Sequence, residues 1–498
     1  MTPFVESSKD QLEGKVDKFL TERLDKTSFR IVTEEASKFL TPNRFDLGFK
    51  LAYLYLKVKN PSLALEIYEH DIRAQTLGQF KEKGNEEKNT FQIYVDHFAK
   101  TFSSIEERGF DHSKSLIPIS RDVTILNGAH RVASAIYLNI PVTCVLTELD
   151  DISPDYQYFL DRNVPEHIMD IAAKTICEFA DDLYLAFLWP SGRHNYGKAE
   201  SFFDGVVYKK SISLNSNGAL NLLVELYKHM DWVGRASDNF PGAHQKLVEC
   251  FTDLKSFTVI LFKSDSLETV QEIKKRVRSL NDIGFSSIHI TDTKEEVVRI
   301  SKLIFNKNGC HFLNFAKPHK FASTIQMIDS VIDVTDPTER NNLILDGSMS
   351  LSVYGLRKAL DVDYLATNSK KFKNDLFSMD AHDSFDHFHK VEKRDLIYNP
   401  KYFFEYLGLK FVSYEQTYIF KKNRGEEKDI NDIAIMSAFI GGDAFGLFLS
   451  KSKQYLFYKK LLFTGRFREL LFAMLKKTKT YKVMRKIYRR LKKLKFLS

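Results

Sequence analysis

Several features that define large classes of protein are scarce or missing in this chain of 498 residues. Its four Cys include no Cys-x-x-Cys pair, a usage typical of reducing compartments. No uncharged apolar run approaches the roughly 18 to 20 residues of a membrane-spanning helix. The first residues also lack the basic start and apolar core of a secretory signal. We therefore expect a cytoplasmic protein without a spanning helix, and ordinary Gly and Pro usage excludes a fibrous protein.

The two charge signs are unevenly distributed. Residues 451–498 hold 17 Lys and Arg and one acid, Glu469, whereas the remaining residues hold 56 basic and 64 acidic groups. An acidic body with a strongly basic tail predicts that the tail is attracted to an anionic surface, either a membrane or a nucleic acid.

The order of apolar runs predicts a multidomain α/β (α+β) protein, because this length corresponds to two to four domains at roughly 100 to 200 residues each. Phe45 to Val58 is an apolar stretch without a helix breaker, and we expect residues 1–60 to be helical. Short β-type runs alternate with helices from 116 to 146 and from 257 to 304. The expected domains are a helical segment, 1–60; an N-terminal α/β domain, 61–165; an α/β domain of unknown role, 166–330; a C-terminal domain, 335–440; and a basic tail, 441–498.

The most informative pattern lies in the C-terminal half. Gly347 and Ser348 follow an apolar strand, Leu343 to Leu345, and Asp361 and Asp363 lie on a later strand. Alternation along a strand sends both carboxylates to one face, about 7 Å apart. Such a pair suits Mg²⁺ (or Mn²⁺), and a Gly-Ser turn presents N–H groups and a hydroxyl to phosphates. The alternative is a plain turn beside solvated acids.

This pattern resembles the nucleotidyltransferase superfamily that includes DNA polymerase beta, in which a Gly-Ser, a helix and an acidic-apolar-acidic strand follow one another. The resemblance covers about 335 to 440 and implies that Asp361 and Asp363 are catalytic metal ligands. Gly347 and Ser348 would hold the phosphates of a nucleoside triphosphate or a nucleotide-activated donor. Asp395, expected on a third strand, is the candidate third catalytic carboxylate.

Two assignments around this motif stay open. Glu392 and Asp383 are rivals of Asp395 for the third carboxylate. Arg357 either binds phosphate or caps a helix C-terminus. Downstream, Gly408 to Ser413 and the following Lys-rich segment resemble the strand and helix that end small bacterial nucleotidyltransferase-like domains.

A second motif lies near the N-terminus, where Gly128 makes a tight turn before a helix and His130 and Arg131 open that helix. Helix N-termini favour anions, and an arginine there adds a forked contact for phosphate. The segment resembles the ParB and sulfiredoxin fold, some members of which are small-molecule kinases. Ala129 stands where sulfiredoxin has its reactive Cys, so the resemblance does not imply sulfinic acid reduction. Glu69 is the candidate catalytic acid.

The N-terminal motif has a structural alternative, in which His130 and Arg131 cap the helix or pair with Asp122. Other histidines are interpreted as structural. We expect the stretch holding His382, His387 and His389 to be a polar loop, because no second group completes a metal site there. His289 is expected at an ordinary strand end.

The basic tail alternates apolar and basic residues at helical spacing, as does a second run, Tyr481 to Leu497. Basic amphipathic helices with aromatic residues lie in anionic membrane interfaces, and each Lys or Arg near the surface contributes about 1 kcal/mol. Nucleic acid is the competing partner, but the apolar stripe favours the membrane. The apolar side is formed by Leu461, Leu462, Phe467, Leu470, Leu471, Met474 and Leu475.

Together these patterns predict a metal-dependent nucleotidyl- or phosphoryl-group transferase, peripheral on the inner face of the cell membrane. The sequence resembles nucleotidyltransferase-like proteins of bacterial capsule and other surface-polysaccharide pathways, which implies a small-molecule or lipid-linked glycan acceptor. The N-terminal site would be a second, small-molecule kinase site. The alternative is a nucleic-acid-binding regulatory or defence protein with a toxin-like nucleotidyltransferase domain.

Overall fold

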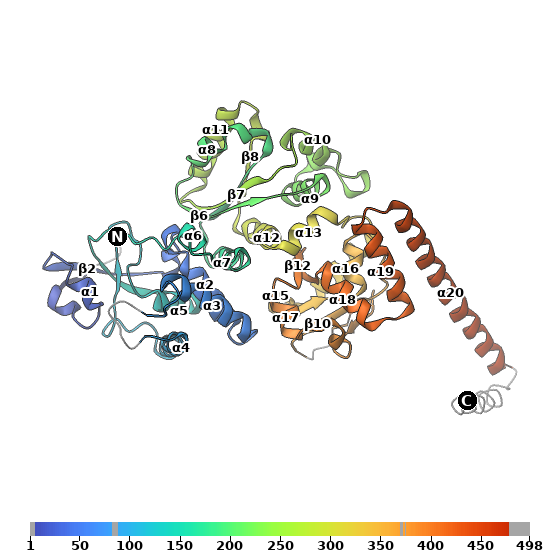
Figure 1. The fold of residues 1–498 in the computed structure, drawn as a ribbon, viewed down its shortest axis with the longest axis horizontal. Helices are drawn as coiled ribbons and strands as arrows, with labels where there is room; N and C mark the ends of the chain where they lie inside the picture. Colours follow the sequence, from blue (N-terminus) through green and yellow to red (C-terminus); the bar gives the residue numbers. More distant parts are fainter. Residues whose placement is uncertain (1–4, 82–87, 369–371, 374, 478–498) are drawn as a thin grey trace. The chain divides into compact units, whose positions relative to one another are not determined.

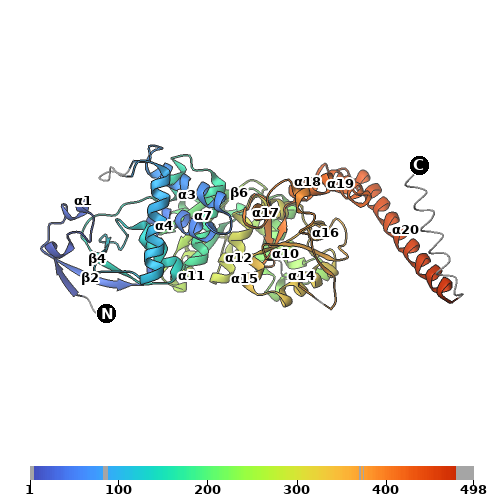
Figure 2. The ribbon, with the colours of Figure 1, turned by 90° about the horizontal axis from the view of Figure 1, so that it is seen from below.

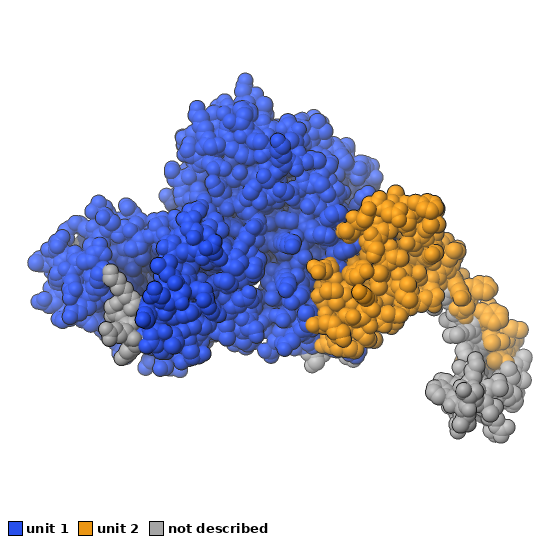
Figure 3. Space-filling view, viewed as in Figure 1, with its two compact units in different colours: residues 1–384, 391–414 blue, residues 385–390, 415–498 orange. Residues whose placement is uncertain are grey.

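The computed structural model describes residues 5–81, 88–368, 372–373 and 375–477. This part of the chain is a mixed α/β protein with three small β-sheets (Figure 1), so the expected fold class is confirmed at that level. The chain divides into two compact units (Figure 3), one of residues 1–384 and 391–414 and one of residues 385–390 and 415–498.

The N-terminal sheet shows that the expectation of an all-helical segment over 1–60 was wrong in its first half. Two strands lie there, and β2 pairs antiparallel with β4, with Ile31 opposite Val145. The strand order is β1–β2–β4–β3, and β3 is parallel to β4. The strands are β1 (Val5–Ser8), β2 (Ser28–Glu34), β3 (Ile117–Ile119) and β4 (Val142–Leu146).

The helices of this region enclose one central helix, α2. It spans Asp46–Leu56, within the predicted stretch from Phe45 to Val58, and it is buried along almost its whole length against α3, α5 and α7. Its apolar sequence therefore fits a helix surrounded by other helices rather than one that lies at the surface. The helices around the sheet are α1 (Lys18–Thr21), α3 (Pro61–Gln75), α4 (Phe91–Arg108), α5 (Ala129–Leu138), α6 (Tyr156–Leu160) and α7 (Glu166–Phe179).

The middle region is built on a second sheet with the order β6–β7–β5–β8, in which all neighbours are antiparallel. The strands and helices predicted between 257 and 304 are confirmed. The strands are β5 (Leu183–Leu188), β6 (Val206–Ile212), β7 (Phe257–Lys263) and β8 (Ile288–Ile290). The helices are α8 (Tyr196–Glu200), α9 (Ser216–Tyr227), α10 (Pro241–Cys250), α11 (Leu267–Asn281), α12 (Lys294–Ile304), α13 (Lys307–Phe315) and α14 (Ala322–Val334).

The third sheet carries the C-terminal motif. Its order is β11–β10–β9–β13–β12, and the central β9 is antiparallel to β10 and parallel to β13. The motif therefore begins where a fully buried central strand ends. The strands are β9 (Leu343–Leu345), β10 (Val362–Ala366), β11 (Met379–Ala381), β12 (Phe403–Tyr406) and β13 (Leu409–Val412). The accompanying helices are α15 (Pro337–Asn341), α16 (Ser348–Val353) and α17 (Lys393–Tyr398).

A buried lysine on β13 connects this strand to the helices α15 and α17. Lys410 Nζ donates to the carbonyl oxygens of Asn341 and Ile397, each at 2.8 Å. Burial lowers the pKa of Lys410 from 10.5 to about 8. The folded protein therefore favours the neutral amine of Lys410. The stability associated with this neutral form is fully present above pH 10.5 and is lost as the pH falls to about 8.

We therefore expect the wild type to gain stability relative to a Lys410→Met variant as the pH rises from 8 to 10.5. The gain should be about 1.4 kcal/mol per pH unit at most. Urea unfolding of both proteins across this range measures the difference. A difference that stays constant or changes in the opposite direction would show that the Lys410 ammonium is not destabilised by burial.

The second unit contains most of α18 (Tyr414–Arg424), together with α19 (Glu427–Ile440) and α20 (Ala444–Lys477), which is a single long helix (Figure 2). Lys421 is buried between Asp429 and Asp432, at 3.3 and 2.8 Å. Gln454 on α20 donates to Asp432 at 2.8 Å, which fixes the first part of α20 to α19. Among the described helices, none combines the length and apolar character needed to cross a bilayer. The predicted amphipathic run from Tyr481 to Leu497 lies outside the described residues.

Candidate active site

The candidate site is built on the turn between β9 and α16. Gly347 has a φ of +59°, a conformation that side chains rarely adopt. A Cβ atom there would lie 2.8 Å from Oδ2 of Asp363. Glycine is therefore required twice, for the turn itself and for the close approach of the Asp363 carboxylate to the backbone. The Asp346 N–H donates to the Asp363 carbonyl oxygen at 2.8 Å, which fixes the two strands at this level.

The structure brings the four motif residues together. Asp363 lies on β10, and Asp361 immediately precedes that strand. The Ser348 hydroxyl lies 3.5 Å from Oδ1 of Asp361, while Asp363 faces Gly347. Both acidic side chains are half-buried. One carboxylate thus lies beside each residue of the Gly-Ser turn.

His382, which the sequence predicted to lie in a polar loop, is also part of this site. His382 follows β11, is buried, and lies between two carboxylates: Nδ1 is 3.2 Å from Asp346 Oδ2 and Nε2 is 3.0 Å from Asp363 Oδ1. Burial lowers the pKa of His382, but the hydrogen bonds to Asp346 and Asp363 outweigh burial and raise it to about 9. The imidazolium therefore donates from both ring nitrogens at neutral pH and holds Asp363 in one orientation.

The expected position of the third carboxylate was wrong. Asp395 lies on helix α17 rather than on a strand, and it accepts a hydrogen bond from Asn60 at 2.7 Å. Asp383 pairs with Lys393 at 3.0 Å, and Glu392 immediately precedes α17. The structure instead connects a different acid to Asp363: the ring of His382 contacts both Asp346 and Asp363.

The donor atoms fit a magnesium ion that is completed by its substrate. Across the described ranges, no three His, Cys, Asp or Glu side chains are grouped so as to hold a metal by themselves. Mg²⁺ is commonly bound by one or two carboxylates, with waters and substrate phosphates supplying the other oxygens. Asp361 and Asp363 are such a pair. Arg357 donates to the neighbouring Lys358 carbonyl oxygen at 3.0 Å, and its contact with phosphate stays a prediction.

No family model, curated protein or solved structure matches this chain. The function of the chain is therefore inferred from the geometry of its own residues and from the resemblance of its sequence motifs.

The N-terminal motif is also held by specific contacts. Gly128 has a φ of +91°, and a Cβ there would lie 2.8 Å from both Arg131 Nη2 and Ile117 Cδ1. The Arg131 guanidinium donates to the Ser115 hydroxyl, and His130 Nε2 lies 2.7 Å from the Tyr68 hydroxyl. Burial lowers the pKa of both side chains.

These contacts change what the N-terminal motif offers to a ligand. Because His130 and Arg131 are both engaged with the protein, the backbone N–H groups at the start of α5 are the remaining anion-binding feature. Glu69, the candidate acid, pairs with Arg73 one turn along α3. A catalytic role for Glu69 stays a prediction.

Sequence analysis missed a buried ionic network in this region. Lys50 Nζ lies 2.6 Å from Asp71 and 3.0 Å from Asp46, and Arg44 binds Asp46 through two nitrogens. All four side chains are buried. Arg44 and Lys50 outweigh burial and lower the pKa of Asp46, whereas burial raises that of Asp71 to about 6. The spacing of Asp46 and Lys50, one turn apart in an apolar helix, was the signal available in the sequence.

Proposed function

We propose that the chain is a metal-dependent nucleotidyl- or phosphoryl-group transferase of bacterial surface-polysaccharide biosynthesis. The observation that supports this most strongly is the placement of Asp363 against the Gly347 backbone, with Asp361 beside Ser348. A Gly-Ser turn at the end of β9, with two acids at the start of its antiparallel neighbour β10, suits a nucleotide whose phosphates bind at this end of the two strands. The surface-polysaccharide context rests on the sequence resemblance alone.

Each residue then has a definite task. Asp361 and Asp363 hold Mg²⁺ or Mn²⁺, which when bound would neutralise phosphate charge and polarise the phosphorus. Gly347 and Ser348 hold the phosphates through backbone N–H groups and a hydroxyl. His382 is a positioning residue, because it contacts Asp363 rather than the reacting atoms. The acceptor, a hydroxyl of a small molecule or lipid-linked glycan, would attack in line.

The transfer activity is tested with purified full-length protein, Mg²⁺ or Mn²⁺, and each of the four nucleoside triphosphates labelled on the α- or γ-phosphate. We expect one triphosphate to bind and to turn over. Transfer of the α-label indicates nucleotidyl transfer, and transfer of the γ-label indicates phosphoryl transfer. A protein that neither binds nor turns over any of the four with either metal would contradict the proposal.

The proposal includes attachment of α20 to an anionic membrane. Many of its described apolar side chains are exposed, and basic residues flank them. Apolar burial and attraction to anionic lipid would both contribute to binding. The exposed apolar residues recur at helical spacing and are Phe445, Phe448, Leu449, Leu456, Phe463, Phe467, Leu470, Leu471 and Met474.

Ending the chain after Tyr458 keeps the Gln454 contact and should abolish binding to vesicles that contain phosphatidylserine. A full-length Phe463→Gln, Phe467→Gln variant keeps every charge and should bind these vesicles at least tenfold more weakly. Vesicle co-sedimentation measures both. The membrane proposal fails if the full chain binds a polynucleotide but not vesicles, and if the double variant binds that polynucleotide equally well. The basic residues of α20 would then bind nucleic acid.

A further inference from the structure

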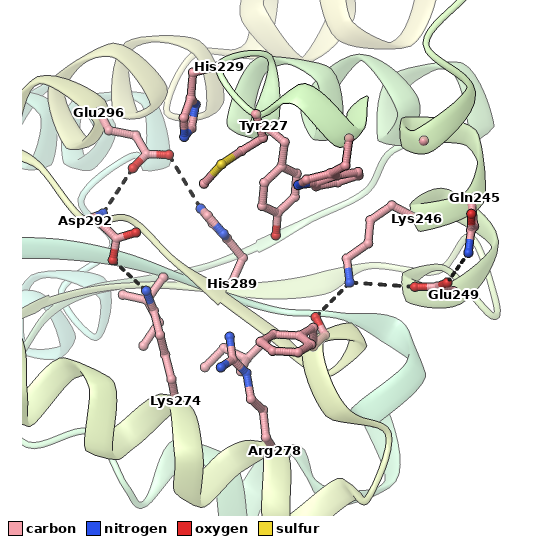
Figure 4. A pocket seen from close by; sticks show the side chains of 16 residues that line it. Tyr227, His229, Gln245, Lys246, Glu249, Lys274, Arg278, His289, Asp292 and Glu296 are labelled. Atoms are coloured by element: carbon pink, nitrogen blue, oxygen red, sulfur yellow. Dashed lines mark hydrogen bonds and ion pairs between the residues drawn. The ribbon is translucent and has the colours of Figure 1, made fainter. Parts of the chain in front are cut away.

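A cavity in the middle region is separate from the candidate active site. It has a volume of about 610 Å³ and is lined by residues between 227 and 296, from α9, α10, α11, β8, α12 and their connections (Figure 4). No residue of the Gly347 to Asp363 motif lines it. Figure 4 shows charged side chains from several of these elements around one space, among them Lys246, Lys274, Arg278 and Glu296.

Among the described residues, one cation that lines the cavity has no counter-ion. Lys274 pairs with Asp292 at 2.6 Å, and Lys246 lies 3.8 Å from Glu249. In the described part of the chain, Arg278 has no ion pair, and its buried Nε has no hydrogen-bond partner. The Arg278 guanidinium lies 4.4 Å from the centre of the Phe285 ring. A half-buried arginine that lies over an aromatic ring is suited to a phosphate or carboxylate of a ligand.

The aromatic wall of the cavity indicates a flat group on that ligand. The side chains of Trp232 and Phe285 line the cavity yet remain 47% and 71% exposed. Tyr227 also lines the cavity, and its ring centre lies 5.2 Å from that of Trp232. Exposed aromatic faces beside a cationic group are favourable surfaces for stacking a base or another planar ring.

Two polar side chains that line the cavity are suited to bind a hydroxyl group of the ligand. His289 Nε2 and Glu296 Oε1 face each other at 3.6 Å, too far for a good hydrogen bond, and neither atom has another partner in the described structure. Both residues line the cavity, and Figure 4 shows their side chains directed toward one another. Burial lowers the pKa of His289, which favours the neutral form of its ring. An ionised carboxylate beside a neutral imidazole is a suitable partner for a sugar hydroxyl.

We propose that this cavity binds a nucleoside phosphate, with its phosphate on Arg278, its base against Trp232 and Phe285, and a ribose hydroxyl at Glu296 and His289. The site is independent of the proposed transferase site, and it gives the middle region a ligand-binding role.

The chain contains two tryptophans, which makes binding directly measurable. Trp232 lines the cavity, whereas Trp189 is fully buried. Full-length protein, excited at about 295 nm, is titrated with AMP, GMP, CMP, UMP and ribose 5-phosphate. We expect at least one nucleotide to change the fluorescence saturably and to bind at least tenfold more tightly than ribose 5-phosphate. The signal should be lost in Trp232→Phe, while calorimetry still detects binding.

Arg276 provides a matched control on the same helix. It also stacks on an aromatic ring, Phe202 at 4.1 Å, but does not line this cavity. Arg278→Gln should weaken nucleotide binding at least tenfold, and Arg276→Gln should leave it within twofold. An Asp361→Ala, Asp363→Ala variant should keep this binding, which separates it from the transferase site. The proposal is overturned if no nucleotide binds, if ribose 5-phosphate binds equally well, or if the two arginine variants behave alike.

Discussion

An Asp363→Asn variant should lose nucleotide turnover by at least about 100-fold while keeping its fold. Asparagine preserves the size of the side chain but removes the charge on which a divalent cation depends, a loss of several kcal/mol in the transition state. Initial rates at saturating Mg²⁺ measure the effect, and circular dichroism melting confirms that the variant is folded.

Asp380 supplies the control for this experiment. It lies opposite Asp363 in the register of the neighbouring strand β11, and it is exposed. Asp380→Asn removes the same charge from the same sheet, and we expect a rate within about threefold of the wild type. Full activity in Asp363→Asn, or equal losses in both variants, would remove Asp363 from the catalytic centre. If the Asp363→Asn variant still transfers the γ-label, we would assign that transfer to the N-terminal motif.

Replacing Lys50 with methionine should lower the free energy of unfolding by about 3 to 5 kcal/mol, the cost of removing one partner from a buried ionic network. Lys50 is the counter-ion of Asp71, which would otherwise be buried beside a second carboxylate, Asp46. Since a whole domain is stable by only about 5 to 15 kcal/mol, this is a large share. Urea unfolding followed by circular dichroism measures it.

An exposed ion pair gives the comparison. Lys18 lies 3.9 Å from Glu22 at the surface, and Lys18→Met should change stability by less than about 1 kcal/mol. A Lys50→Met, Asp71→Asn double variant should recover part of the loss, because the uncompensated charge is then gone. If Lys50→Met is no more destabilising than Lys18→Met, the network does not stabilise the fold.

Local patterns predicted those parts of the fold that local interactions determine. The strand β7 and helices α2, α11 and α12 follow from apolar runs and helical spacing. The Gly347 turn with Asp361 and Asp363 nearby follows from a strand, a short helix and a returning strand within about 20 residues. In these cases the elements that determine the outcome are neighbours in sequence.

The missed features depend on contacts between distant segments. Strand β2 exists through its pairing with β4, which no pattern in residues 28–34 reveals. His382 reaches Asp363 because β11 joins the edge of β10. Asp395 precedes an apolar run that resembles a strand, but this run forms helix α17. The cavity around Arg278 likewise exists only after five elements have assembled.

The ionic network also joins parts of the N-terminal region that are far apart in the sequence. Arg44 donates to the Ile125 carbonyl oxygen at 2.6 Å, Lys50 belongs to α2 and Asp71 to α3. A partly folded chain in which α2 has packed without α3, or without the segment before Gly128, would bury charges that have no counter-ion. Such intermediates are strongly disfavoured. Local opening of this region should therefore be suppressed, so that the amides of α2 and of the Gly128 turn exchange with solvent hydrogen together, in a single cooperative event.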